Sequence, residues 1–216
     1  MMAGRRYAAF LFDMDGTLID SIPSAVRIWT RWAERHGVDV PSLLHAMHGV
    51  RAIETIRRFA PHADHEAEAA QLTQDEIDDV DGVLPIPGAA EFLASLPADR
   101  WAIVTSAPRD LALVRLAAAG LAPPAVLVTA DDVSHGKPAP DCYLAAAALL
   151  GVNAADCLVW EDAPAGIAAG EAAGADVAII TATHASSIDT PHRTFADYRS
   201  IVAVSNLDSG LAIAAR

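Results

Sequence analysis

The sequence is short of positive charge. Its 216 residues include 15 lysine and arginine residues against 28 aspartate and glutamate residues, for a formal net charge of −13. Nucleic acids and anionic membrane surfaces attract proteins that carry patches of lysine and arginine. The charge balance therefore argues against both as partners, and an anionic small molecule would have to be held by a few local cations.

Long apolar runs and cysteines are scarce as well. No run approaches the roughly 18 to 20 residues of a membrane span, and the run at 7–12 ends at Asp13 without a site typical of signal-peptide cleavage. We therefore expect a cytoplasmic protein. Cys142 and Cys157 are the only cysteines. Cys157 begins an apolar run, which favours a small buried residue over half of a disulfide.

The apolar residues form short runs that lack polar alternation. This is typical of strands buried on both faces of a parallel sheet. Between the runs lie helical patterns that end at glycine. The alternation predicts an α/β, doubly wound, Rossmann-like domain. The runs are 7–12, 101–104, 125–128, 157–160 and 177–180, and the helical patterns are 110–119, 141–150 and 163–173.

One region interrupts this alternation with consecutive helical patterns and no strand. We expect an inserted all-α domain at 21–84, within a core formed by 1–20 and 85–216. Near the end of the insertion the acidic run "DEIDDVD" (75–81) is expected to be a solvated helix face. The insertion's helical patterns are 23–36, 41–47, 51–59 and an acidic segment that reaches residue 80.

Reactive side chains follow several of the apolar runs. Each has an ordinary explanation by itself, such as a helix cap or a solvated acid. The carboxyl ends of parallel strands meet at one edge of a sheet, where α/β proteins bind ligands, so we expect these groups to share one site. They are Asp13 and Asp15, Thr105 and Ser106, Lys137 in the loop "HGKPAP", and Glu161 and Asp162.

Four carboxylates and one ammonium at one edge predict a divalent cation. Oxygen ligands with room for water suit Mg²⁺. With Mg²⁺ held by Asp13 and Asp162, Asp13 stays ionised, whereas Asp15 can hold a proton and act as an acid. Attack by the Asp13 carboxylate on phosphorus would give an aspartyl-phosphate.

Four segments resemble, in order, the motifs of the haloacid dehalogenase superfamily of phosphohydrolases: "DMDGT" (13–17), "VTS" (104–106), "GKP" (136–138) and "EDAPAGIAAGEAAGA" (161–175). The resemblance spans nearly the whole chain. The longer segments "VTSAPRD", "DDVSHGKPAPDCYL", "WEDAPAGIAAG" and "HGVRAIETIRRFAP" are similar to the sugar phosphatases and the glycerol-3-phosphate and 2-deoxyglucose-6-phosphate phosphatases of that superfamily. The resemblance implies an Mg²⁺-dependent hydrolase of small sugar or polyol phosphates.

The resemblance also implies roles for individual residues. Asp13 would be the nucleophile, Asp15 the general acid and then base, and Lys137 the cation that steadies Asp13 and the phosphoryl oxygens. The phosphate-binding residues would be Gly16, Thr17, Thr105 and Ser106, and the metal ligands would be Asp13, the main-chain carbonyl of Asp15, Asp162 and, directly or through water, Glu161.

By the same resemblance, the insertion is a cap that closes over the site and sets specificity. His48 and Arg51 lie in the segment of the insertion most similar to the sugar phosphatases, so both are candidates for substrate contact. Arg51 could meet a hydroxyl or a second anion. A solvated helix start is the alternative for this segment.

Three other functions compete with hydrolysis. Phosphomutases of the β-phosphoglucomutase kind place a histidine twelve residues after the nucleophile, where this chain has Ala25. Dehalogenases normally lack the second aspartate, Asp15. A non-catalytic module that binds a phosphorylated ligand would be expected to carry degraded motifs, and these are intact. The expected partner is a small phosphorylated metabolite, and we expect a monomer, although the sequence leaves the oligomeric state open.

Overall fold

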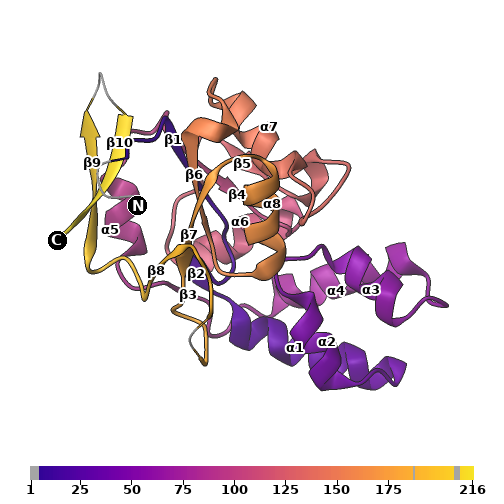
Figure 1. The fold of residues 1–216 in the computed structure, drawn as a ribbon. Helices are drawn as coiled ribbons and strands as arrows, with labels where there is room; N and C mark the ends of the chain where they lie inside the picture. Colours follow the sequence, from indigo (N-terminus) through magenta and orange to yellow (C-terminus); the bar gives the residue numbers. More distant parts are fainter. Residues whose placement is uncertain (1–4, 187, 207–209) are drawn as a thin grey trace.

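The computed structural model describes residues 5–186, 188–206 and 210–216 (Figure 1). Its centre is a six-stranded sheet in the order β5-β4-β1-β6-β7-β8, and every neighbouring pair in it is parallel. The predicted α/β parallel-sheet fold is confirmed. The strands are β1 (Ala9–Phe12), β4 (Trp101–Val104), β5 (Leu127–Val128), β6 (Cys157–Glu161), β7 (Asp176–Ile180) and β8 (Arg193–Phe195).

Helices cover both faces of this sheet, because successive side chains of the central strand point to opposite sides. Phe10 and Phe12 belong to one apolar cluster, which also contains residues of α5 (Ala89–Ala94) and α6 (Arg109–Ala118). Leu11 belongs to the other, with residues of α7 (Asp141–Leu149) and α8 (Pro164–Ala172). Burial on both faces explains why β1 shows no polar alternation.

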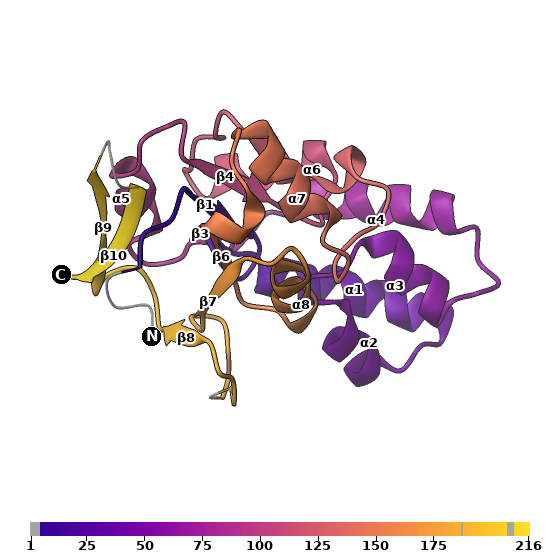
Figure 2. The same cartoon turned by 45° about the horizontal axis from the view of Figure 1, so that its top comes forward.

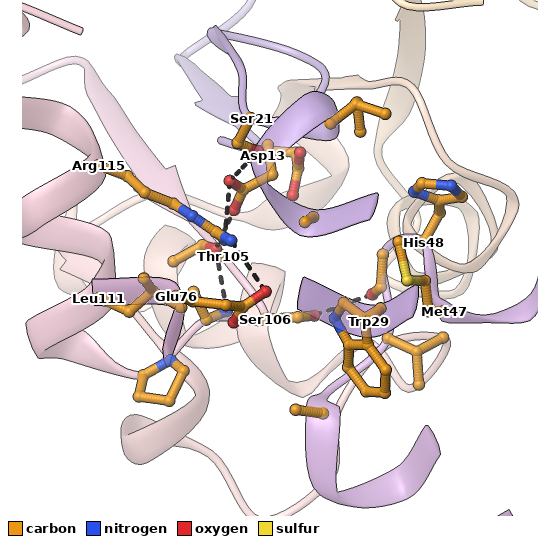
Figure 3. A pocket seen from close by; sticks show the side chains of 18 residues that line it. Asp13, Ser21, Trp29, Met47, His48, Glu76, Thr105, Ser106, Leu111 and Arg115 are labelled. Atoms are coloured by element: carbon orange, nitrogen blue, oxygen red, sulfur yellow. Dashed lines mark hydrogen bonds and ion pairs between the residues drawn. The ribbon is translucent and has the colours of Figure 1, made fainter. Parts of the chain in front are cut away.

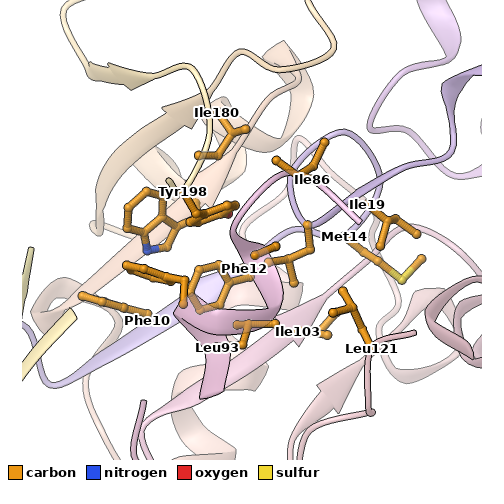
Figure 4. Packing of buried hydrophobic residues seen from close by; sticks show 14 of the residues in the cluster. Phe10, Phe12, Met14, Ile19, Ile86, Leu93, Ile103, Leu121, Ile180 and Tyr198 are labelled. Atoms are coloured by element: carbon orange, nitrogen blue, oxygen red, sulfur yellow. The ribbon is translucent and has the colours of Figure 1, made fainter. Parts of the chain in front are cut away.

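Aromatic rings fill the first of these clusters (Figure 4). The rings of Phe12 and Trp160 stack with centroids 5.8 Å apart, and Tyr198 packs against Phe92 at 5.1 Å. This packing anchors β1 and β6 side by side, and the two strands carry the acidic motifs at their carboxyl ends. Cys142 and Cys157 are both buried and free, as predicted.

Four helices form an insertion between β2 (Ile19–Asp20) and β3 (Leu84–Pro85), which pair as a short antiparallel ribbon. No strand lies between β2 and β3 in the described chain. We call these four helices the helical insertion. They pack around an apolar cluster of their own that includes Trp32 and Ile56. The helices are α1 (Ile22–His36), α2 (Val40–Met47), α3 (Ala52–Phe59) and α4 (His65–Asp78).

The acidic run at 75–81 is not a uniformly solvated face. Glu76 is buried with only 6% of its surface exposed, because α4 packs against core helix α6. The expectation of a solvated face is therefore wrong at this residue. The charges on either side of it gave no sign that this one faces inward.

The C-terminal residues form an antiparallel hairpin of β9 (Ile201–Asn206) and β10 (Gly210–Ala215), in which Leu211 pairs with Tyr7. The hairpin and the helical insertion lie at opposite ends of the molecule (Figures 1 and 2). Two short 3₁₀ helices, η1 (Ala130–Asp132) and η2 (Ala154–Asp156), complete the secondary structure of the described residues. None of the helices in the described residues is both long and apolar enough to cross a membrane.

Candidate active site

The carboxyl edge of the sheet gathers most of the reactive residues predicted from the sequence. Asp13 directly follows β1, Thr105 directly follows β4, and Glu161 is the last residue of β6, with Asp162 after it. A hydrogen bond from the Asp13 amide to the Trp160 carbonyl (2.9 Å) continues the pairing of β1 with β6 to this point. Parallel topology therefore places these side chains in one site.

Lys137 lies at the centre of this site with 1% of its surface exposed. Its Nζ donates to Asp13 Oδ1 at 2.5 Å, to Glu161 Oε1 at 2.7 Å and to the Val104 carbonyl at 3.3 Å. It is also the only lysine in the sequence. The ammonium is thus a built part of the site and not a surface charge.

Glu161 has both of its carboxylate oxygens engaged. Oε1 accepts from Lys137 and from the Tyr143 hydroxyl at 2.8 Å, and Oε2 accepts from the amides of Asp162 (2.9 Å) and Ala163 (3.1 Å). A Cβ at Gly166 would lie 1.5 Å from Oε1, so the glycine is needed to admit this side chain. Hydrogen bonds to both carboxylate oxygens therefore hold Glu161 in contact with Lys137.

The crowded carboxylates have perturbed acidities. Burial and the charge of Glu161 raise the pKa of Asp13 to about 7, against the lowering effect of Lys137. Burial and the charges of Asp13 and Glu161 raise the pKa of Asp162 well above its ordinary value. Burial alone would lower the pKa of Lys137, but the charges of Asp13 and Glu161 raise it well above its ordinary value. One ammonium does not neutralise this cluster.

The site has the donor set of a divalent cation site. Carboxylate oxygens of Asp13, Glu161 and Asp162 all lie within 4.8 Å of one another. Oxygen-only donors with incomplete charge compensation fit Mg²⁺. Because the oxygens of Glu161 already accept four hydrogen bonds, Asp13 and Asp162 are the carboxylates with free lone pairs toward such an ion.

The turn after β1 presses against Asp162. Gly16 has a φ of +91°, and a Cβ there would lie 2.1 Å from Asp162 Oδ2. The Gly16 amide donates to the Ile19 carbonyl at 2.7 Å, and the Thr17 hydroxyl is 3.4 Å from Asp162 Oδ1. The structure thus places Gly16 and Thr17 against the carboxylate of Asp162. Their part in phosphate binding stays a prediction.

A pocket opens from Asp13 and Asp15 between the core and the helical insertion (Figure 3). The core contributes the polar floor, and the insertion contributes a wall that is largely apolar and aromatic. Core residues lining the pocket include Asp13, Asp15, Thr105, Ser106, Leu111 and Arg115, and insertion residues include Ala25, Trp29, Met47, His48, Val50 and Glu76.

His48 and Arg51 occupy different places. His48 lines the pocket, and burial together with nearby His184 and His45 lowers its pKa. Arg51 is not among the lining residues described. Its guanidinium pairs with Glu54 and donates to the carbonyl of Ser134 at 3.1 Å, in the loop that leads to Lys137. Its contact with substrate stays a prediction, whereas the structure shows its contact with the core at Ser134.

Two charged residues in the pocket were not singled out from the sequence. Arg115 contacts Asp15, and Glu76 contacts Arg115, at 3.0 and 3.1 Å. Arg115 lies in the otherwise apolar stretch "LALVRLAAAG", and a lone charge in such a stretch is a signal that could have been followed. Glu76 carried no comparable signal among its acidic neighbours.

Comparison with protein families identifies the chain. The model of the family described as haloacid dehalogenase-like hydrolase matches residues 7–174. The chain belongs to this family. The resemblance inferred from the four motifs is therefore confirmed, and with it the expectation of a hydrolase.

The individual proteins that are similar to this haloacid dehalogenase-like hydrolase include named phosphatases and a hydrolase of known structure. Hexitol phosphatase A of Escherichia coli is 43% identical over 191 residues, which cover 86% of this chain and 87% of that protein. 2-Deoxyglucose-6-phosphate phosphatase 2 of Saccharomyces cerevisiae is 33% identical over 200 residues, covering 82% and 81%. The crystal structure of a hydrolase from Pseudomonas syringae superposes with a TM-score of 0.70 at 29% identity, covering 81% of this chain and 84% of that one.

Proposed function

We propose that this hydrolase is an Mg²⁺-dependent phosphatase that cleaves small sugar or polyol phosphates through an aspartyl-phosphate on Asp13. One observation carries the proposal: the Asp13 carboxylate is held by the buried Lys137, beside Asp162, at the floor of a pocket that also contains Asp15. Nucleophile, cation, metal ligand and proton donor are thus within reach of one phosphoryl group.

In the first half-reaction the Asp13 carboxylate forms a bond to phosphorus while the bond from phosphorus to the ester oxygen breaks. A protonated Asp15 gives its proton to that departing oxygen. In the second half-reaction a water oxygen bonds to phosphorus, the bond from Asp13 to phosphorus breaks, and Asp15 takes the proton of the water. Inorganic phosphate leaves and both carboxyl groups return to their starting states.

In both steps the negative charge on the phosphoryl oxygens must be offset by nearby positive charge. Lys137 sits against Asp13 and is placed to offset charge on the phosphoryl oxygens. Asp13, Asp162 and the main-chain carbonyl of Asp15 would hold Mg²⁺, which when bound supplies further charge neutralisation for those oxygens. Glu161 would act by fixing Lys137, since its own oxygens are engaged.

The pocket wall supports a ligand with hydroxyl groups and no second anion. Arg115 is the one arginine or lysine among the lining residues described, and it already pairs with Asp15 and Glu76. Burial, with His184 and His45 nearby, lowers the pKa of His48, which favours its neutral form. Trp29 offers an apolar face of the kind that packs on sugars. The names of the hexitol and 2-deoxyglucose-6-phosphate phosphatases point to the same substrate class.

We further propose that residues 21–84 act as the cap of an α/β core formed by 1–20 and 85–216. The insertion touches the core around the pocket: the Ser106 hydroxyl donates to the Gly49 carbonyl at 2.9 Å, and Arg51 bonds the loop at Ser134. A lid of this kind excludes water and macromolecules while admitting a metabolite.

The test is a steady-state screen of phosphate esters with Mg²⁺: hexitol and hexose phosphates, glycerol phosphates, 2-deoxyglucose 6-phosphate, phosphoglycolate and nucleoside monophosphates. We expect the highest kcat/KM for a sugar or polyol ester. Asp13→Asn should abolish turnover, whereas Asp110→Asn, on the exposed start of α6, should not. A highest kcat/KM for a nucleotide or for phosphoglycolate would contradict the substrate class, and activity in Asp13→Asn would contradict the mechanism.

The same screen separates hydrolysis from phosphoryl transfer between sugar hydroxyls. Ala25 lines the pocket with a methyl group, where a mutase of this superfamily would carry a histidine. We therefore expect release of inorganic phosphate from sugar 1-phosphates. Conversion of a sugar 1-phosphate to its 6-phosphate without phosphate release would favour the mutase instead.

A further inference from the structure

A chain of contacts between charged groups runs from Glu76 in the helical insertion through Arg115 to Asp15, and Figure 3 shows the side chains of Glu76 and Arg115 lying toward each other. Glu76 Oε1 accepts from Arg115 Nη2 at 3.1 Å, and Arg115 Nη1 donates to Asp15 Oδ1 at 3.0 Å. The side chains of Arg115 and Glu76 are 6% and 7% exposed. The side chain of Asp15 is 25% exposed, so water screens its contact with Arg115 more than it screens the buried contact between Arg115 and Glu76.

Arg115 and Glu76, the other two members of this chain of contacts, come from different parts of the fold. Arg115 lies on core helix α6, and Glu76 lies on α4 of the helical insertion, with α4 packed on α6. Trp29, on α1, lines the same pocket as Glu76. A buried guanidinium needs anionic partners, and removal of one leaves an uncompensated charge. The contact between α4 and α6 therefore supplies Arg115 with its second anionic partner, Glu76.

The hydrogen bonds fix which oxygen of Asp15 can carry a proton. Oδ1 accepts from Arg115 and also from the Ser21 hydroxyl, at 2.6 Å. The nearest polar side-chain atom recorded for Oδ2 is the Thr105 hydroxyl at 3.5 Å, too long for a strong hydrogen bond. The two donors on Oδ1 leave Oδ2 as the oxygen that can hold the transferable proton.

We propose that Arg115 is a positioning residue that orients Asp15 for proton transfer to the leaving oxygen, and that Glu76 holds Arg115 in this position when α4 rests on α6. The proposal relies on the proposed function in taking Asp15 as the general acid. It makes acid catalysis depend on a contact between the cap and the core. A merely structural ion pair would instead affect all substrates alike.

The experiment compares two esters in the full-length enzyme with Mg²⁺. One is the best sugar or polyol phosphate from the screen, whose alkoxide must be protonated as it leaves. The other is 4-nitrophenyl phosphate, whose leaving group departs as an anion. The value of kcat/KM covers the steps up to departure of the leaving group and omits later hydrolysis of the aspartyl-phosphate. The ratio of the two kcat/KM values therefore reports the acid role of Asp15.

We expect Arg115→Met to lower kcat/KM for the alkyl ester at least tenfold more than for the aryl ester. Arg115→Lys, which keeps a cation but places all its donors on one nitrogen, should restore part of the ratio. Glu76→Gln should change the ratio in the same direction by a smaller factor. In an Asp15→Asn background, Arg115→Met should change the ratio no further. Arg109→Met removes an exposed arginine of the same helix and should leave the ratio unchanged.

Equal losses on both esters in Arg115→Met and Glu76→Gln would overturn the proposal, as would a further change of the ratio in the Asp15→Asn background. If Arg115→Met does not fold, Arg115→Lys and Glu76→Gln decide by the same ratio. Failure of the proposed function would look different, because the wild-type enzyme would then hydrolyse neither ester or would keep its activity in Asp13→Asn.

Discussion

Replacement of Lys137 by Met tests how far the site depends on its one ammonium. Methionine has a similar length but no charge, so the buried carboxylates of Asp13 and Glu161 would lose their shared partner. Breaking a buried ion pair from one side costs about 3–5 kcal/mol. The cost has an upper limit, because Asp13 can take a proton instead.

That limit follows from the pKa of Asp13. Protonating a carboxyl with an ordinary pKa of 3.8 at pH 7 costs about 1.4 kcal/mol per pH unit, or about 4 kcal/mol in all. In the variant the folded-state pKa of Asp13 lies above its unfolded value, so the folded protein binds the extra proton. Asp13 already has a pKa of about 7 in the wild-type protein, and loss of the ammonium raises it further. The penalty of Lys137→Met should therefore shrink as the pH falls from above 7 through this value and change little at lower pH, where Asp13 is protonated in both folded proteins.

The assay is thermal and urea unfolding of both proteins with a chelator present. We expect Lys137→Met to lower Tm at pH 7 by about 6–20 °C, given about 2–4 °C per kcal/mol for a chain of this size. Arg57→Met is the control, since its ion pair with Glu66 is exposed and should contribute less than about 1 kcal/mol. Wild-type stability in Lys137→Met at pH 7, or a penalty that does not change with pH, would refute this reasoning.

Three further predictions concern the same site. Gly16→Ala should lower kcat/KM at least 100-fold and raise the Mg²⁺ concentration needed for activity, because its Cβ would displace Asp162. Gly37→Ala, with a φ of +64° but open space around it, should cost about 1–2 kcal/mol of stability and leave the rate unchanged. Chelation should stop phosphate release and added Mg²⁺ should raise Tm; an unchanged rate would contradict the metal assignment. Selective labelling of lysine should give one side-chain NMR signal that does not titrate below pH 10.5, and a midpoint at or below that value would contradict the ion pairs of Lys137 with Asp13 and Glu161.

The sequence by itself determined the sheet and the residues at its edge. Buried parallel strands need apolar residues on both faces, which makes them recognisable as unbroken runs. Their carboxyl ends must meet at one edge, so Asp13, Thr105 and Asp162 could be brought together without a model of their contacts. Lys137 was included from its place in the loop "HGKPAP" before the helical pattern at 141–150, and its ammonium does contact Asp13.

Tertiary structure alone decided what surrounds these residues. The pairing of Glu76 with Arg115 joins residues 39 positions apart on two helices, and it depends on how the insertion packs on the core. Arg51 likewise reaches the loop at Ser134 and not the pocket lining. Helical periodicity shows which residues share a face of one helix, but it does not show which other helix that face will meet. For that reason the partners of the acid Asp15 could be found only in the folded molecule.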